Sequence, residues 1–371
     1  MKDQKLKILY ITQKVDFNDD LLAAIHSWLE DLAGKVNKLY IVCLYKGEVK
    51  LPDNCQVFSL GKEQGISRLK YILKFYKVVI PLIFTKKING IFIHMNEIYI
   101  FLLLPLRLFL KIFNIPIVWW KAHGKIINYS KLALNFVDRV VTSAPSAFKV
   151  KTPKKRVIGQ GIDIQKFKPL DVIKENKNLI NIIAIGRLSP VRNYELLLKA
   201  VRQVLDNLPE TKLKVSIYGG VPQGKNQEYH QQLIKLREEL NLQNIVSFKG
   251  AVPNHQLPRL INQADFVVNP GGSNSLDKAI VETMACQRII IDSNAASWEI
   301  LEKSDLTEKE KSLFLFKRGH HLDLAEKIKN VINLNKDKKA FIEKSLRQLV
   351  VNHHNVDNLN RQILEVFNEV I

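Results

Sequence analysis

Residues 182–198 read Ile-Ile-Ala-Ile-Gly-Arg-Leu-Ser-Pro-Val-Arg-Asn-Tyr-Glu-Leu-Leu-Leu. The short apolar run at the start indicates a buried strand, and the apolar spacing from Tyr194 onward indicates a helix. Between them lies a turn that carries Arg187 and Arg192. A strand followed by a helix is the unit of a parallel α/β sheet, which binds ligands beyond the carboxyl ends of its strands. The two arginines therefore predict a site for a phosphate or diphosphate, although two solvated loop arginines would look the same.

The same alternation of short apolar runs and longer helical patterns extends in both directions from this stretch. Runs typical of buried strands lie at 8–11, 38–44, 90–94, 117–120 and 139–142, and, after the polar stretch 171–177, at 182–185, 213–218, 245–248, 266–269 and 288–291. Strands that alternate with helices form a parallel sheet covered on both faces. The sequence therefore predicts two similar doubly wound α/β halves joined near residue 170, followed by an amphipathic helix over 356–371.

Length, charge and cysteine content limit what the protein can be. A chain of 371 residues with 46% apolar and 25% charged residues forms two or three globular domains and is not disordered, collagen-like or disulfide-dense. The net charge of +20 calls for an anionic partner: nucleic acid, phospholipid head groups or phosphorylated small molecules. Cys43, Cys55 and Cys286 have neither disulfide nor zinc spacing, which favours a reducing compartment. The histidine pairs at 320–321 and 353–354 lack metal-ligand spacing and are interpreted as surface residues.

Two apolar segments of the first half are candidates for contact with a membrane. Residues 98–120 are strongly apolar, but Arg107, Lys111 and two prolines interrupt them, so we expect a buried helix followed by a strand rather than a membrane span. Residues 67–87 interleave six basic residues with apolar ones, which is typical of a helix that lies on an anionic membrane surface. A core helix with a solvated basic edge has the same pattern, so both interpretations stay open.

A second anion-friendly turn follows the predicted strand at 266–269. It contains Gly271-Gly272-Ser273-Asn274-Ser275 and leads into a helix over 276–286. Glycines let the backbone approach a ligand, Ser275 can cap the helix, and the helix dipole favours an anion at its N-terminus. Glu282 lies about two turns into this helix, where a carboxylate can accept both hydroxyls of a ribose. An isolated Glu is more often a surface residue or a partner of Lys278.

These motifs, taken in order, resemble a known family, the retaining glycosyltransferase family 4 of GT-B architecture. The resemblance covers about 181–300 and rests on Gly186-Arg187-Leu188, Arg192-Asn193, Tyr218-Gly219-Gly220, Val246-Ser247-Phe248-Lys249-Gly250, Gln263-Ala264-Asp265, Asn269-Pro270 and Glu282-Thr283-Met284-Ala285. Upstream, residues 159–169 are similar to the family's interdomain signature. His123-Gly124 resembles the pair that the family's N-terminal half places in the cleft. Each motif alone is weak, whereas the ordered set is specific.

The resemblance implies a fold and a reaction. The fold would be two Rossmann-like domains facing across a cleft: an acceptor-side domain at 1–169, on which the helix 356–371 packs back, and a nucleotide-sugar-binding domain at 170–355. The reaction would transfer a sugar with retention from a UDP- or GDP-sugar to a glycan, a polysaccharide precursor or a lipid-linked acceptor. It would need no metal or other cofactor, because fixed positive groups would stabilise the departing diphosphate.

The resemblance also implies roles for individual residues. Arg187 and Arg192 would bind the donor diphosphate, with Arg192 where the family usually has Lys, while Glu282 would hold the ribose and His123 would contact the donor sugar. The predicted catalytic residues are therefore His123, Arg187, Arg192 and Asn274, and the predicted donor-binding residues are Gly186, Arg187, Arg192, Gly219, Ser275, Leu276 and Glu282. No metal ligands are predicted.

Two positions depart from the family's pattern. Asn274 stands where the family usually has Glu, and an amide can bind a sugar hydroxyl but cannot offset positive charge. Asp277 stands where the family often has Gly, and a carboxylate beside a diphosphate is repulsive unless Lys278 or Arg192 compensates it.

The sequence thus predicts a cytoplasmic glycosyltransferase and leaves open whether residues 67–87 also place it on the inner face of the membrane. Two alternatives stay open. A catalytically weak sugar-nucleotide-binding protein on the same fold is consistent with Asn274. A basic nucleic-acid-binding protein would account for the net charge, but the chain has no RNP, KH or helix-turn-helix signature, so we expect no nucleic acid.

Overall fold

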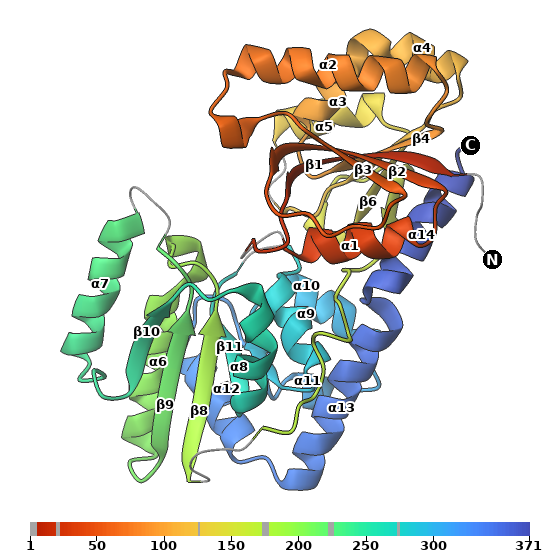
Figure 1. Ribbon diagram of the computed structural model, residues 1–371. Coiled ribbons are helices and arrows are strands. Elements are labelled where there is room, and N and C mark those ends of the chain that lie inside the picture. The colour runs from red at the N-terminus through yellow and green to blue at the C-terminus, as the bar shows by residue number, and fades with distance from the viewer. Residues whose placement is uncertain (1–5, 20–22, 125–126, 173–177, 222–225, 273–274) are drawn as a thin grey trace. The chain divides into compact units, whose positions relative to one another are not determined.

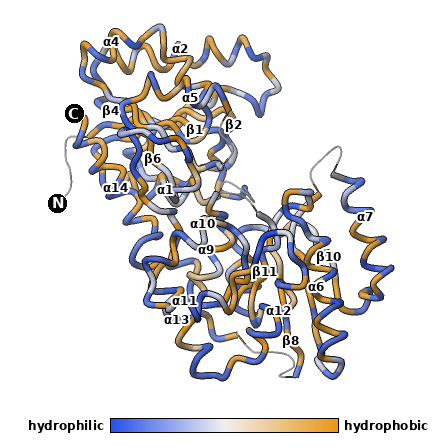
Figure 2. The backbone as a smooth tube through the Cα atoms, turned by 180° about the vertical axis from the view of Figure 1, so that it is seen from behind, coloured by the Kyte–Doolittle hydropathy of each residue, from blue (hydrophilic) through white to orange (hydrophobic). Residues whose placement is uncertain are grey.

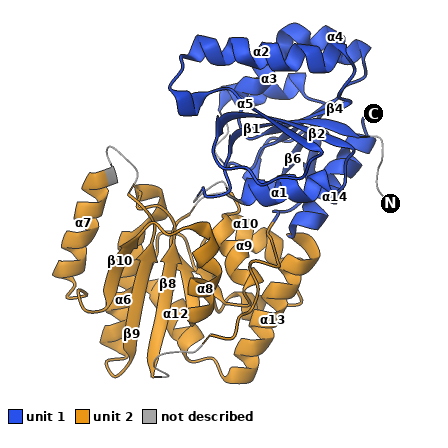
Figure 3. Cartoon of the chain, viewed as in Figure 1, with its two compact units in different colours: residues 1–161, 355–371 blue, residues 162–354 orange. Residues whose placement is uncertain are grey.

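The computed structural model describes residues 6–19, 23–124, 127–172, 178–221, 226–272 and 275–371. The chain divides into two compact units, coloured separately in Figure 3: the first comprises residues 1–161 and 355–371, the second residues 162–354. The end of the chain therefore belongs to the first unit. The first boundary falls after Gly161, whereas the sequence analysis placed it after Pro169.

In the described part of the chain, the first unit is built on a seven-stranded parallel sheet in the order β3-β2-β1-β4-β5-β6-β7. Its strands are β1 (Lys7–Val15), β2 (Lys38–Lys46), β3 (Cys55–Ser59), β4 (Gly90–His94), β5 (Ile117–Trp120), β6 (Arg139–Thr142) and β7 (Lys155–Val157). Its helices are α1 (Ala23–Ala33), α2 (Arg68–Phe84), α3 (Ile98–Leu102), α4 (Arg107–Ile112), α5 (Asn128–Ala133) and α14 (Val356–Asn368). Figure 1 shows α2 to α5 on one side of this sheet and α1 with α14 on the other.

The first unit has a hydrophobic core on each face of its sheet. Successive side chains of a strand point to opposite faces, so Leu9 of β1 packs in the same cluster as Phe75 of α2, whereas Ile8 packs with Trp28 of α1 and Phe367 of α14. A Cβ built on Gly90 would lie 2.8 Å from the Phe367 ring. The α14 helix therefore completes the second core layer.

The second unit repeats the design with a smaller sheet. Its described residues form five parallel strands in the order β10-β9-β8-β11-β12. They are β8 (Leu179–Ile185), β9 (Lys212–Tyr218), β10 (Val246–Gly250), β11 (Phe266–Asn269) and β12 (Ile290–Asp292). The helices are α6 (Tyr194–Asn207), α7 (Asn226–Glu239), α8 (Leu257–Gln263), α9 (Lys278–Ala285), α10 (Ala295–Leu301), α11 (Glu308–Lys311), α12 (His321–Ile332) and α13 (Lys336–His353). Helix α6 packs against α12, and α9 packs against α13.

The predicted strands are all present, with ends that shift by a few residues, but two strands were missed. Both β3 and β7 lie at the edges of the first sheet and are only partly buried. Edge strands are short and often charged, and the Lys-Arg-Val sequence of β7 has the composition of a solvated loop.

The apolar segment 98–120 is more broken than predicted. Two short helices, α3 and α4, flank the 3₁₀ turn Leu104–Leu106, because Pro105 cannot donate a backbone hydrogen bond. The strand β5 follows as predicted. Within the ranges that the structure describes, no helix is both long and apolar enough to cross a membrane.

One histidine was interpreted wrongly. His354 is buried, not at the surface, because the chain turns there from α13 toward α14 and the backbone carbonyl of His354 accepts a hydrogen bond from Ile162 N at 2.8 Å. Burial lowers the pKa of His354 to about 3, so the imidazole stays neutral at physiological pH.

Candidate functional site

The turn between β8 and α6 places Arg187 and Arg192 at the carboxyl edge of the second sheet. Gly186 has a φ of 151°, and a Cβ built on it would lie 2.8 Å from Nε of Arg192. Gly219, which follows β9, packs beside the turn so closely that a Cβ there would lie 1.9 Å from the Gly186 carbonyl oxygen. Asn193, in the left-handed region with a φ of 52°, directs the chain into α6. The two glycines therefore allow the Arg192 side chain to lie against the turn.

The two arginines have different surroundings. Arg187 is exposed and forms no ion pair with any described residue. Arg192 is half-buried, with Nη1 at 3.0 Å from Asp277 Oδ2 and 3.4 Å from Asn269 Oδ1. The carboxylate of Asp277 is thus compensated by Arg192, one of the two residues expected to do so. The same ion pair offsets part of the positive charge that Arg192 can offer to a ligand.

Asn269, the last residue of β11, links this ion pair to Asp292, the last residue of β12. Its amide nitrogen lies 2.9 Å from Asp292 Oδ1 and 3.5 Å from Asp277 Oδ2, and the Ser297 hydroxyl donates to the second oxygen of Asp292. Burial raises the pKa of Asp292 to about 7; the Ser297 hydrogen bond opposes this shift and the negative charge of Asp277 adds to it. The edge of the sheet therefore carries a buried polar network with one group that titrates near neutral pH.

Glu282 is buried in α9, with 4% of its surface exposed, which excludes the alternative of a solvated surface residue. Burial raises the pKa of Glu282, while the positive charges of Lys278 and Lys166 and a hydrogen bond with Asn254 act in the opposite direction. The positive charges of Lys278 and Lys166 thus both act on this carboxylate, while an ion pair between Glu282 and Lys278 stays a prediction.

The loop after β11 approaches the arginine turn through its backbone. A Cβ built on Gly271 would lie 3.0 Å from the Val191 carbonyl oxygen and 3.2 Å from Arg192 Cα. A Cβ on Gly272 would lie 2.1 Å from Nε of Arg318. The loop thus lies close to other residues of the chain, and the predicted approach of its glycines to a ligand stays a prediction.

The remaining predicted residues of this loop differ in what they do. Ser275 is not the N-cap of α9, because that position is taken by Asp277; instead the Ser275 carbonyl accepts a hydrogen bond of 2.6 Å from Asn294. Leu276 is buried. Asn274 lies outside the described residues, so its predicted catalytic role stays a prediction.

The polar groups at the carboxyl edge of the first sheet are bonded to each other. Lys121, which follows β5, is buried and forms an ion pair with Glu97, and the Ser130 hydroxyl donates to the same carboxylate oxygen. Burial alone would raise the pKa of Glu97, but the hydrogen bonds from Lys121 and Ser130 outweigh it and lower the pKa. His123 follows this cluster and is exposed, and its predicted contact with the donor sugar stays a prediction.

Sequence reasoning missed Asp292, Ser297 and Arg318. Asp292 directly follows the predicted strand at 288–291, so the rule that singled out Arg187 at the end of its strand could also have found Asp292. Arg318 carried no such signal, because the segment before it is not a predicted strand.

Solved structures share this fold over nearly the whole chain. Anabaena Alr3699/HepE, solved in complex with UDP, has a TM-score of 0.73 and 19% identity, with 98% of this chain and 100% of that chain covered. Sucrose-phosphate synthase from Thermosynechococcus elongatus has a TM-score of 0.76 and 16% identity, with 98% of each chain covered. The protein is therefore an α/β protein of the GT-B class with two Rossmann-like units, which confirms the predicted fold class.

Sequence comparisons add the family. Residues 165–348 match the family described as glycosyl transferases group 1. A D-inositol 3-phosphate glycosyltransferase from Frankia alni is 30% identical over 138 residues, which cover 35% of this chain and 34% of the relative. The human GDP-Man:Man(3)GlcNAc(2)-PP-Dol alpha-1,2-mannosyltransferase is 26% identical over 195 residues, which cover 51% of this chain and 38% of the relative.

The second unit thus matches the glycosyl transferases group 1 family over most of its length, and the resemblance drawn from the motifs is confirmed. In these alignments the chain spans little more than a third of the length of the curated relatives it matches.

Proposed function

We propose that the protein is a glycosyltransferase that moves a sugar from a nucleotide-sugar donor, a UDP- or GDP-sugar, to a glycan or lipid-linked acceptor. The observation that carries this proposal is the pair Arg187 and Arg192 on the glycine-lined turn at the carboxyl edge of the second sheet. The match of residues 165–348 to the glycosyl transferases group 1 family supports the reaction class. The complex of a protein of similar fold with UDP, and a relative named for GDP-Man, support the donor class.

The chemistry follows from where charge develops. The bond between the anomeric carbon and the β-phosphate oxygen breaks, its electron pair stays on the oxygen, and a nucleoside diphosphate leaves. The acceptor hydroxyl oxygen forms the new bond to the anomeric carbon, and its proton passes to the departing diphosphate oxygen. In our proposal the acceptor attacks from the face that the diphosphate leaves, so the anomeric configuration is retained.

In this proposal the chain's own cations replace a metal. Arg187 and Arg192 contact the diphosphate, and positive groups fixed in advance stabilise the leaving group more in the transition state than in the bound donor. Glu282, whose carboxylate feels the positive charges of Lys278 and Lys166, accepts hydrogen bonds from the ribose hydroxyls. Gly186 and Gly219 shape the turn on which these contacts depend.

A donor panel tests this function. We expect release of UDP or GDP from at least one of UDP-glucose, UDP-N-acetylglucosamine and GDP-mannose when a glycan or lipid-linked acceptor is present, also in the presence of EDTA. Binding of a donor without transfer or hydrolysis over a broad acceptor set would support the sugar-nucleotide-binding protein instead. Failure to bind any of the donors would reject the proposal.

We also propose that the first unit attaches the protein to the cytoplasmic face of an anionic membrane, which would bring it to polysaccharide precursors carried by lipids. We call the helices α2 and α4 the basic apolar face. Its apolar side chains are unusually open to solvent: Leu69 and Leu73 of α2 are 67% and 61% exposed, and Leu108 and Ile112 of α4 are 65% and 63% exposed. Figure 2 shows hydrophobic and hydrophilic positions interleaved along both helices.

The two helices touch, and their charge is of one sign. The rings of Phe84 and Phe109 lie 4.8 Å apart, so the end of α2 meets α4. The basic residues Arg68, Lys70 and Lys77 are exposed, and no Asp or Glu occurs between Gln64 and Asn96. The exposed leucines can insert among lipid acyl chains, and the neighbouring lysines can bind anionic head groups because no acidic residue repels these.

Vesicle binding tests this attachment. Replacing Lys70, Lys74 and Lys77 with Gln should lower partitioning into phosphatidylglycerol vesicles by roughly 100-fold, at about 1 kcal/mol for each lysine. The matched control replaces the exposed lysines Lys212, Lys214 and Lys235 of the second unit with Gln and should change little. If the two triple variants bind phosphatidylglycerol vesicles equally well, the basic apolar face is not the membrane-binding surface. The same conclusion would follow if wild type bound phosphatidylcholine vesicles as well as phosphatidylglycerol vesicles.

A further inference from the structure

The segment before α12 brings a third arginine to the carboxyl edge of the second sheet. Leu315 pairs in parallel with Asp292, the last residue of β12; Asp292 N donates to Phe314 O at 3.1 Å and Phe316 N donates to Asp292 O at 3.0 Å. This segment therefore runs beside β12 in the same direction. Arg318, just after it, emerges at the edge where β8 and β11 also end.

The side chain of Arg318 lies against the backbone of the glycine loop. A Cβ built on Gly272 would lie 2.1 Å from Nε, 2.6 Å from Cδ and 2.7 Å from Cζ of Arg318. The neighbouring Gly271 has its own close approach to the Arg192 backbone, at 3.2 Å from Cα. Residues 271–272 are thus in close contact both with Arg318 and with the arginine turn.

The three arginines at this edge differ in whether a carboxylate partner offsets their charge. Arg192 is held by Asp277 in an ion pair of 3.0 Å, whereas Arg187 and Arg318 are exposed and have no carboxylate partner among the residues that the structure describes. Asp277 thus offsets one of the three arginines. Two uncompensated guanidinium groups remain, and each can donate a fork of hydrogen bonds to a phosphate.

We propose that Arg318 is a phosphate-binding residue of this site, and that it supplies the positive charge that Asp277 takes from Arg192. The ligand is the diphosphate of a nucleoside diphosphate, free or as the leaving group of the donor. The inference rests on the proposed function, because it takes the edge of the second sheet as the donor site. Arg318 then binds and stabilises the diphosphate beside Arg187 and Arg192, and the ion pair with Asp277 offsets part of the charge that Arg192 offers.

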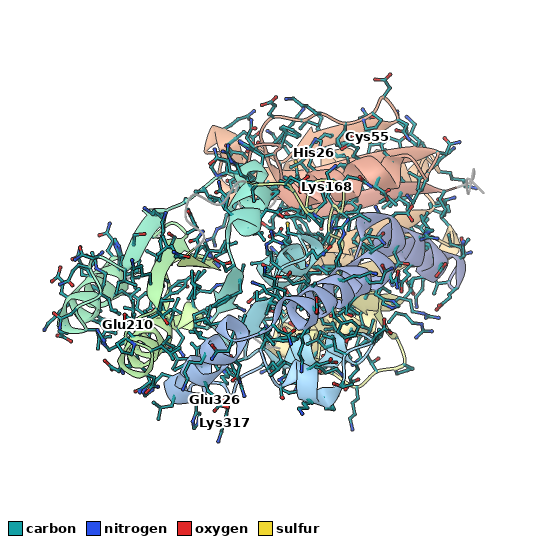
Figure 4. All side chains as sticks on the ribbon, turned by 90° about the horizontal axis from the view of Figure 1, so that it is seen from below. His26, Cys55, Lys168, Glu210, Lys317 and Glu326 are labelled. Carbon is teal, nitrogen blue, oxygen red and sulfur yellow. The ribbon has the colours of Figure 1, made fainter. Side chains whose placement is uncertain are left out.

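Calorimetric titration with UDP and GDP tests this role. Arg318→Ala should weaken the binding of the diphosphate that wild type binds by roughly tenfold, the loss expected for one charge-assisted contact, while binding of uridine or guanosine stays unchanged. The matched control is Lys317→Ala: Lys317 is the adjacent cation, is exposed and lies at the periphery of the second unit (Figure 4). The control should bind as wild type, because a diffuse surface charge adds little.

A second variant tests whether Arg318 replaces the positive charge that Asp277 offsets on Arg192. Asp277→Gly releases Arg192, so it should tighten diphosphate binding, and Arg318→Ala should then cost several-fold less than in the wild-type background. An equal loss in both backgrounds would overturn the link between Asp277 and Arg318.

The outcomes separate this inference from the function on which it rests. If wild type binds UDP or GDP and Arg318→Ala binds it equally well, Arg318 has no such role while the proposed function stands. If Arg318→Ala weakens nucleoside and diphosphate alike, the residue supports the loop and does not contact phosphate. If wild type binds neither diphosphate, both proposals are rejected together.

Discussion

The two sheets end in polar residues that are arranged in opposite ways. At the edge of the first sheet, the Lys121 ammonium and the Glu97 carboxylate bind each other and are both largely buried. At the edge of the second sheet, Arg187 and Arg318 are exposed and lack carboxylate partners among the described residues. In one unit the charges at the sheet edge are thus paired with each other, whereas in the other two guanidinium groups have no carboxylate partner among the described residues.

This difference has a physical basis. A buried charge needs a partner, because the loss of hydration is otherwise uncompensated. An exposed guanidinium keeps its hydration and gives it up only when a phosphate arrives. Substitutions at the first edge should therefore affect stability, and substitutions at the second edge should affect binding.

The largest effect is expected for Glu97→Ala. It leaves the buried Lys121 without its carboxylate, so the free energy of unfolding of the first unit should fall by about 2–3 kcal/mol. Urea unfolding followed by tryptophan fluorescence suits this measurement, because Trp28, Trp119 and Trp120 lie in the first unit.

The control for this experiment removes both charges, as Glu97→Gln with Lys121→Met, and should recover part of the loss. A single variant as stable as wild type would mean that the first edge is not held by this ion pair.

Arg187→Ala should lower the affinity for nucleotide and leave the stability of the fold unchanged. Affinity for UDP or GDP should fall by roughly tenfold or more, since a charge-assisted hydrogen bond contributes about 1.5–3 kcal/mol, while the unfolding midpoint stays that of wild type. Calorimetry and thermal unfolding measure the two quantities. Arg202→Ala is the control, because Arg202 pairs with Asp206 on α6. Unchanged nucleotide affinity in Arg187→Ala would remove this residue from the donor site.

The smallest effect concerns the buried network of the second edge. The pKa of Asp292 is raised from 3.8 to about 7, so the folded protein holds the proton more tightly than the unfolded chain, and stability falls as pH rises between these values. Asp292→Asn keeps an uncharged polar group there and should lose this dependence. Relative to wild type, the variant should gain about 1–2 kcal/mol in unfolding free energy between pH 6 and pH 8, measured by circular dichroism in urea. A pH-independent difference would show that Asp292 does not titrate in this range.

Much of the fold could be predicted from the sequence because central strands of a parallel sheet are apolar on both faces. Runs such as 90–94, 117–120 and 266–269 contain almost only apolar residues, and the structure has strands with these bounds. The edge strands β3 and β7 have no such signature, because one side of each is exposed and polar residues are tolerated there.

The candidate site was predictable only in part. Arg187 and Arg192 could be found because they follow a strand directly in sequence. The partnership of Arg192 with Asp277 joins residues 85 positions apart, and the approach of Arg318 to Gly272 depends on a segment that pairs with β12 through a single bridge. Such contacts are set by tertiary packing, which periodicity within one segment does not report.

The placement of α14 bears on how the chain acquires its structure during synthesis. Leu359, Ile363 and Phe367 are fully buried in the first unit, and the Asn360 amide donates to the Trp28 carbonyl at 2.9 Å. Residues 1–161 are synthesised long before this segment, so one core layer of the first unit stays uncovered until α14 is made. The second unit is contiguous in sequence, so all of its residues are made before α14. We therefore expect the later-made half to reach its final form first, and a nascent chain arrested before residue 355 to depend on chaperones for its earlier half.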